Sequence, residues 1–166
     1  ISTFFWPMKN AKPWDEEEAL EKLRKYCAWQ ERCRSEAWQK FTQLGCPRND
    51  VQRLLGILEH EGFLEEARYA RAYARGKFNQ KGWGRMKIRE GLRSKRVDES
   101  LIEDALELIE PDAYLERLVE ITRKRIGEAD MNDWEAQQKL RAYLEGKGYE
   151  WEAIAMALKR INESTN

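Results

Sequence analysis

One spacing of apolar residues recurs three times along the chain, and it constrains the fold more than any other feature of the sequence. In each copy a second apolar residue follows the first after ten positions, and a third follows after four more. The residue before the third is also apolar or small in every copy. The three sets are Leu44, Leu54 and Leu58; Leu92, Ile102 and Leu106; and Leu144, Ile154 and Leu158. Because the copies are nearly evenly spaced along the 166 residues, the sequence predicts three tandem modules.

Each module is predicted to contain three helices. Gly, Pro and charged residues interrupt each apolar set and predict a turn between its two helices. The predicted turns span residues 45–50, 94–99 and 146–151. A further helix precedes each pair and is expected to begin near Asp15, a suitable N-cap, near Leu64, and at Pro111. The sequence therefore predicts nine helices in three sets of three.

Composition supports an all-α fold, because valine is scarce and no stretch alternates apolar and polar residues for long enough to form a sheet. A module of this size buries little apolar surface alone, so we expect the modules to pack end to end as an elongated, curved rod. The predicted boundaries are an N-terminal extension over residues 1–14 and three-helix repeats over residues 15–62, 63–110 and 111–162.

Other features argue against a membrane protein. The chain has no run of roughly 20 apolar residues, which a membrane-spanning helix requires. Its first ten residues lack a signal-peptide cleavage signature. We therefore expect a cytoplasmic monomer without membrane association.

The sequence offers little catalytic or metal-binding chemistry. Cys27, Cys33 and Cys46 have no zinc-site spacing, so we expect free thiols, with a metal site that also recruits His60 as the alternative. The chain has one histidine, no phosphate-binding loop and no Gly-x-Ser-x-Gly motif. An enzyme is the weakest interpretation, and no cofactor is expected.

Positive charge is concentrated between Arg68 and Arg96, where eleven cations face a single acid, Glu90. The whole chain has 30 cations and 30 acids, so its net charge of +0 hides a strongly polarised molecule. We predict that this basic segment binds DNA or a protein filament. The predicted site residues are Arg68, Arg71, Arg75, Lys77, Lys81, Arg85, Lys87, Arg89, Arg93, Lys95 and Arg96.

Helical spacing predicts two stripes of cations in the basic segment. The first contains Lys81, Arg85, Arg89, Arg93 and Arg96, and the second contains Arg68, Arg71 and Arg75. Like charges at these steps repel, and a bound anion is the simplest reason to tolerate that repulsion. Arginine outnumbers lysine here, which suits forked contacts with phosphate or carboxylate. The alternatives are a solvated helix face and neutralisation by the acidic flanking modules.

The seven tryptophans are expected mostly in the core or at module junctions. Trp83 lies within the basic segment, between Gly82 and Gly84. It could stack on a base or pack between helices, and we favour packing.

The basic segment also carries a family resemblance. "FLEEARYARAYARGKFNQKGWGRMKIREGLRSKRVDESLIEDAL", residues 63–106, resembles the central portion of the RecX family, the bacterial regulators of the RecA recombinase. The matching positions are Leu64, Glu65, Glu66, Arg68, Tyr69 and Ala70, then Trp83, Gly84, Lys87, Ile88 and Leu92, and upstream the segment "RCRSEAWQKFTQLG". The chain departs from the family pattern at Ala67, which follows Glu66 where Glu is usual, and at Gln39, where Leu is common.

The resemblance covers about residues 15 to 160 and implies a non-enzymatic protein of tandem three-helix repeats. Such a protein would lie in the groove of the RecA filament on DNA and inhibit ATP hydrolysis, strand exchange and co-protease activity. It would thereby modulate recombination, DNA repair and the SOS response, and it could also bind DNA directly. From the residues alone two alternatives stay open. One is a non-specific binder of single- or double-stranded nucleic acid that acts without RecA, and the other is an inert helical scaffold.

Overall fold

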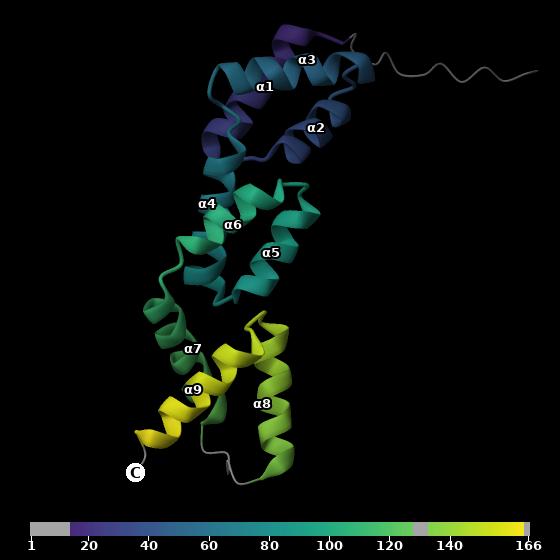
Figure 1. The fold of residues 1–166 in the computed structure, drawn as a ribbon. Coiled ribbons are helices and arrows are strands. Elements are labelled where there is room, and N and C mark those ends of the chain that lie inside the picture. Colours follow the sequence, from purple (N-terminus) through teal and green to yellow (C-terminus); the bar gives the residue numbers. More distant parts are fainter. Residues whose placement is uncertain (1–13, 128–132, 165–166) are drawn as a thin grey trace, which may run out of the picture. The chain divides into compact units, whose positions relative to one another are not determined.

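A computed structural model of the chain describes residues 14–127 and 133–164. Over these residues the protein contains nine α-helices and no strand (Figure 1). The helices are α1 (Glu16–Trp29), α2 (Arg34–Gln43), α3 (Arg48–His60), α4 (Glu66–Lys81), α5 (Arg85–Ser94), α6 (Glu99–Glu107), α7 (Pro111–Ile126), α8 (Trp134–Gly146) and α9 (Trp151–Glu163). The predicted all-α class and the three sets of three helices are confirmed. The predicted extension over residues 1–14 lies outside the described residues except for Trp14, and the curved rod stays a prediction.

The chain divides into two compact units, Ile1–Leu64 and Glu65–Asn166. The first unit contains α1 to α3, and the second contains both later sets of helices, α4 to α6 and α7 to α9. The predicted repeat boundaries themselves stay predictions.

The repeated apolar residues form the core of each set of helices. Seven of the nine are at most 3% exposed: Leu54, Leu58, Leu92, Ile102, Leu106, Leu144 and Ile154. Leu44 and Leu158 are half-buried. Burying each such side chain stabilises the fold by roughly 1.5–3 kcal/mol, so the repeated spacing accounts for much of the packing.

The first unit begins as the sequence predicts. The Asp15 carboxylate accepts a hydrogen bond from the Glu18 backbone N–H at 2.9 Å and caps α1. Two ion pairs on the surface of this unit join its first helix to its third: Arg53 with Glu16, and Arg24 with Glu61. Each pair links α1 to α3 or to the residue that follows it.

The turn between the second and third helix has the same backbone geometry in all three sets. An N–H beyond the turn donates to a carbonyl in the last turn of the preceding helix, as in a Schellman C-cap. The bonds run from Cys46 to Phe41 (3.0 Å), from Val97 to Leu92 (3.3 Å) and from Tyr149 to Leu144 (3.2 Å). The residue before each donor has a positive φ: 82° at Gly45, 61° at Arg96 and 90° at Gly148. The three turns are therefore structural copies of one another.

In the second unit, the turn between α8 and α9 lies against the start of α5. The Gly84 N–H donates to the Lys147 carbonyl at 2.8 Å, and the Met86 N–H donates to the Gly148 carbonyl at 3.0 Å. These carbonyls satisfy N–H groups at the start of α5 that have no partner within the helix. A Cβ on Gly84 would lie 2.2 Å from the Gly148 oxygen, so the approach requires glycine.

A buried tyrosine adds a polar link at the same junction. Tyr114 on α7 is 3% exposed and accepts a hydrogen bond from the Arg85 backbone N–H at 3.0 Å. Its hydroxyl donates to the Glu150 carboxylate. Burial and the hydrogen bond with Glu150 raise the Tyr114 pKa, which keeps the hydroxyl protonated as a donor. Tyr114 therefore joins α5, α7 and the start of α9.

The tryptophans within the described residues divide evenly between exposed and half-buried positions. Trp29, Trp134 and Trp151 are exposed, with Trp29 at 80%. Trp14, Trp38 and Trp83 are half-buried, and Trp6 lies outside the described residues. An amphipathic helix has room for an aromatic residue on its outer face, so residue type alone did not place these side chains.

Candidate functional site

The basic segment is divided between two helices and a turn. Five of the predicted site residues lie on α4, namely Arg68, Arg71, Arg75, Lys77 and Lys81. Four lie on α5, namely Arg85, Lys87, Arg89 and Arg93. Lys95 and Arg96 lie in the turn that follows α5.

The predicted stripe from Lys81 to Arg96 is wrong at both ends. α4 ends at Lys81 because Gly82 adopts a left-handed conformation, with φ at 62°. α5 begins at Arg85 and ends at Ser94, so Arg96 lies beyond it. Only Arg85, Arg89 and Arg93 share one helix face.

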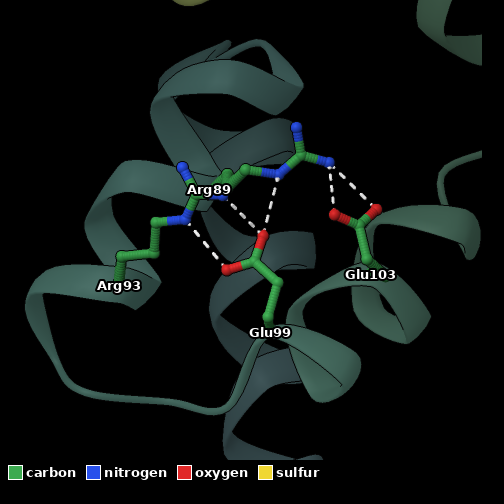
Figure 2. Close-up of polar contacts among 4 residues, drawn as sticks. All are labelled: Arg89, Arg93, Glu99 and Glu103. Carbon is green, nitrogen blue, oxygen red and sulfur yellow. Dashed lines mark hydrogen bonds and ion pairs between the residues drawn. The ribbon is translucent and has the colours of Figure 1, made fainter.

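Two of the α5 arginines pair with acids of α6, as Figure 2 shows. Arg89 Nη2 donates to both carboxylate oxygens of Glu103, at 2.7 and 2.9 Å. Arg93 makes a forked contact with Glu99 through Nε (2.9 Å) and Nη2 (2.7 Å). Hydrogen bonds from Arg93 hold the pKa of the Glu99 carboxyl below its usual value. Neutralisation within the molecule therefore applies to these two arginines, and the acids come from the next helix rather than from a flanking module.

Glu99 and Glu103 were not predicted from the sequence as partners of these arginines. Arg89 is fourteen residues from Glu103, and Arg93 is six residues from Glu99. The turn at residues 94–99 brings α6 back along α5, so the available signal was an acidic helix directly after a basic one.

The other two α5 cations hold α5 against the third set of helices. Arg85 Nη2 donates to the Ile109 carbonyl at 2.7 Å, and its guanidinium lies 4.1 Å from the centre of the Tyr114 ring. Lys87 Nζ donates to the Gly146 carbonyl at 3.1 Å, which caps the C-terminus of α8. These contacts give both side chains a structural role.

Trp83 is half-buried between two lysines of the basic segment. The Lys77 and Lys87 ammonium groups lie 4.8 and 4.9 Å from the centre of its ring. Cation–π contacts within the protein therefore use this ring, in agreement with the packing role that we favoured for it.

The cations of α4 and of the turn after α5 have fewer acidic partners than those of α5. Arg71 lies 3.7 Å from Glu65, and half of its side chain is exposed. Arg75 and Arg96 are exposed, and neither forms an ion pair within residues 14–127 and 133–164. Together with Lys81, which is also exposed, these residues present positive charge that a partner can reach.

The three cysteines are buried thiols that form no disulfide, and within the described ranges no group of three or more His, Cys, Asp or Glu side chains is arranged to hold a metal ion. In the same ranges, every helix is too short or too polar to cross a membrane.

Two family models match the second unit. The model described as "RecX, second three-helix domain" matches residues 66–106, and "RecX, third three-helix domain" matches residues 112–158. The first match covers α4 to α6, and the second covers most of α7 to α9.

Curated relatives carry the same family name. The chain is 29% identical over 121 residues to "Regulatory protein RecX" of Clostridium acetobutylicum, a match that covers 70% of this chain but only 56% of that relative. It is 28% identical over 129 residues to "Regulatory protein RecX" of Legionella pneumophila strain Corby, which covers 78% of this chain and 85% of the relative.

Solved structures share the fold. The crystal structure of RecX from Lactobacillus salivarius matches with a TM-score of 0.80 at 22% identity, over 89% of this chain and 96% of that one. A second crystal structure, of a regulatory protein RecX, matches with a TM-score of 0.79 at 25% identity, over 87% and 71% of the two chains. Because the two family models together match more than half of its residues, the chain belongs to the RecX family.

Proposed function

We propose that this chain binds the RecA filament on DNA and inhibits its ATPase, strand exchange and co-protease activities, and that it thereby modulates recombination, DNA repair and the SOS response. The observation that carries the proposal is the family match over both later sets of helices. The chain matches only 56% of the Clostridium acetobutylicum relative, so the activity of the whole relative is itself part of the proposal.

The proposed contact surface is the basic segment, with its cations in different roles. Arg71, Arg75 and Arg96 are exposed and meet DNA phosphates or acidic filament groups directly. Arg93 is more than half exposed and can exchange its pairing with Glu99 for a partner's anion. The other predicted site residues contribute positive potential or hold the helices in place. Such potential steers an anionic partner even where single contacts are weak.

The proposal assigns no catalytic step and no cofactor to the chain. It describes a monomer that acts in the cytoplasm on the RecA filament and on DNA of either strandedness, without sequence readout. Regulation would arise from occupancy of the filament alone.

The test is the ATPase rate of preformed RecA filaments on single-stranded DNA, titrated with substoichiometric amounts of the chain at physiological salt. We expect progressive inhibition by the wild type. The variant R71Q/R75Q/R96Q should need about tenfold more protein, since three exposed charge contacts are each worth roughly 0.2–1 kcal/mol. Arg85 is left unchanged because its loss would disturb the packing of α5.

A matched control changes three exposed cations elsewhere in the second unit. Lys139, Lys159 and Arg160 lie on α8 and α9, away from the basic segment in sequence. K139Q/K159Q/R160Q should inhibit as the wild type does. Full inhibition by R71Q/R75Q/R96Q would show that the contact surface is wrong, and absence of inhibition by the wild type would show that the function is wrong.

The exposed, uncompensated arginines also favour the second candidate, a nucleic-acid binder that acts without RecA. Its affinity for single strands should fall with salt, with a logarithmic slope of roughly −0.7 per neutralised phosphate. Binding of DNA with that dependence, but without any effect on RecA ATPase, would favour this second function.

A further inference from the structure

A hollow of about 350 Å³ lies in the second unit, where the end of α4 meets α7 and α8. Five of its lining residues are cations: Lys81, Arg117, Lys124, Arg125 and Lys147. Four of these lie outside the basic segment, and none of the lining residues is acidic. Its volume falls within the roughly 300–1,000 Å³ of small-molecule sites.

Among the described residues, one carboxylate forms ion pairs with two of these five cations. Glu120 on α7 accepts hydrogen bonds from Arg117 at 2.8 Å and from Lys124 at 2.7 Å. The bonds from Lys124 and Arg117 lower the pKa of this carboxyl, so it is ionised at neutral pH. A single negative charge leaves most of the positive charge around the hollow uncompensated, and the cations repel one another.

Two of the five cations cap the C-terminus of α4. Arg117 Nη2 donates to the Asn79 carbonyl, and Lys147 Nζ donates to the Lys81 carbonyl, each at 3.1 Å. Both carbonyls lie in the last turn of α4, where cations offset the partial negative charge of the helix end. Helix capping explains these two residues without a ligand.

The other three cations lie in the last turns of α4 and α7, but none of their side chains donates to a carbonyl within the described part of the chain. Lys81 and Arg125 are exposed and form no ion pair within the described part of the chain, and the Lys124 side chain is 74% exposed despite its contact with Glu120. The Arg125 guanidinium lies 4.7 Å from the centre of the Tyr143 ring. The contact with the ring restricts the guanidinium and leaves its N–H groups available for a forked contact with an anion.

The geometry points to a binding site for a phosphate-bearing ligand of nucleotide size in this hollow. Lys81, Lys124 and Arg125 contact the phosphate, and the hollow takes the attached nucleoside. A free nucleotide and one nucleotide unit of a single strand offer the same group. The site goes beyond the proposed function, because most of its residues lie outside the basic segment and none of its chemistry requires RecA.

The test is a titration of the ¹⁵N-labelled full chain, followed by NMR, with AMP in one series and a short oligothymidylate in another. We expect the amide signals of Gly82, Tyr143 and Lys147 to shift and saturate. K81Q/K124Q/R125Q should bind the effective probe about tenfold more weakly, as three exposed charge contacts predict. The control K139Q/K159Q/R160Q also removes two lysines and one arginine, but these residues do not line the hollow. It should bind as the wild type does.

Each outcome decides the proposal. Saturation by AMP identifies a free-nucleotide site, whereas saturation by the oligonucleotide alone identifies a site for one unit of a single strand. Either result supports the proposal. Absence of shifts at the hollow with either probe overturns it, as does an equal loss of affinity in both variants, which would indicate diffuse attraction only. Because the titration contains no RecA, its failure is distinct from the failure of the ATPase test.

Discussion

At the scale of single residues, Arg96 is where binding and stability are most clearly opposed. It is the one non-glycine residue with a positive φ in the described ranges, and the equivalent turn positions in the other two sets are Gly45 and Gly148. A left-handed conformation costs an L-residue roughly 1–2 kcal/mol. Arg96 is also exposed. A binding role in the basic segment gives a reason to keep arginine at a position that the fold itself would fill with glycine.

We therefore expect Arg96→Gly to stabilise the protein and to weaken its binding. The gain should be at most about 1 kcal/mol, because the relief of backbone strain exceeds the entropy that glycine adds to the unfolded chain. Urea unfolding measures the first effect, and DNA affinity or RecA inhibition measures the second. The reciprocal variant Gly45→Arg has open space around the new side chain, so it should lose stability through its φ of 82° alone. A loss of stability in Arg96→Gly would contradict the argument.

At the scale of elements, the sequence predicted helices and turns well because one apolar spacing serves both local periodicity and the core. Leu92 and Ile102 are 0% exposed and lie on two helices joined by the predicted turn. The spacing failed where a break interrupts it. Lys81 and Arg85 are four residues apart, a spacing that would place them on one face of a continuous helix. Gly82 ends α4, however, and Gly84 precedes α5.

Contacts between elements were beyond the sequence argument. Arg89 meets Glu103, and Gly84 meets Lys147, because of how the helices pack, and periodicity within a helix carries no record of that packing. The other four cations around the hollow were missed for the same reason, since residues such as Lys147 reach the predicted Lys81 only in the folded unit. Charge counting found the basic segment but not its partners.

The close contact between α5 and the α8–α9 turn predicts a sharp difference between two glycines. Gly84→Ala places a Cβ 2.2 Å from a backbone oxygen, which cannot move without opening the junction. It should lose roughly 1–3 kcal/mol, the usual range for overpacking. Gly76→Ala, inside α4 with no atom within 4 Å of the added Cβ, should gain up to about 1 kcal/mol from helix propensity.

Urea unfolding followed by circular dichroism measures both changes. Equal stabilities of the two variants would mean that the α8–α9 turn does not hold the start of α5. A loss in Gly84→Ala should also disturb the Tyr114 side chain, which accepts its hydrogen bond from the next residue, Arg85.

At the scale of the whole molecule, the net charge of +0 results from two kinds of charge. Some charges are paired, as between Arg53 and Glu16 in the first unit and between Arg93 and Glu99 in the second. Others, such as Arg75, are exposed and form no ion pair in the described ranges. Paired charges govern how stability responds to pH, whereas unpaired ones govern how the molecule attracts an anionic partner.

The paired carboxylates predict the acid side of the stability profile. Hydrogen bonds from Arg53, Arg24, Arg93 and Lys124 lower the pKa values of Glu16, Glu61, Glu99 and Glu120, respectively. A carboxylate with a lowered folded pKa contributes stability above its unfolded pKa and loses it as the pH falls through the folded value. The free energy of unfolding should therefore fall below about pH 4.5.

The alkaline side of the profile depends on the second unit, where burial raises the pKa values of both Tyr114 and Tyr149. The second of these groups can be tested alone, and it is Tyr149. Its hydroxyl is buried without a hydrogen-bond partner among the described residues, and burial raises its pKa above the ordinary value of 10.0. The unfolded chain then loses this proton first, so the free energy of unfolding falls as the pH rises above about 10.

Tyr149→Phe should reduce that alkaline loss and leave the acid side unchanged. At neutral pH it should cost little, because the hydroxyl that it removes makes no hydrogen bond within the described structure. Urea unfolding from pH 2 to pH 11, followed by circular dichroism, tests all three expectations. If the variant and the wild type lose stability equally above pH 10, Tyr149 is not the group that titrates. The unchanged acid side is the internal control, since Tyr149 is not among the partners that lower the four carboxyl pKa values.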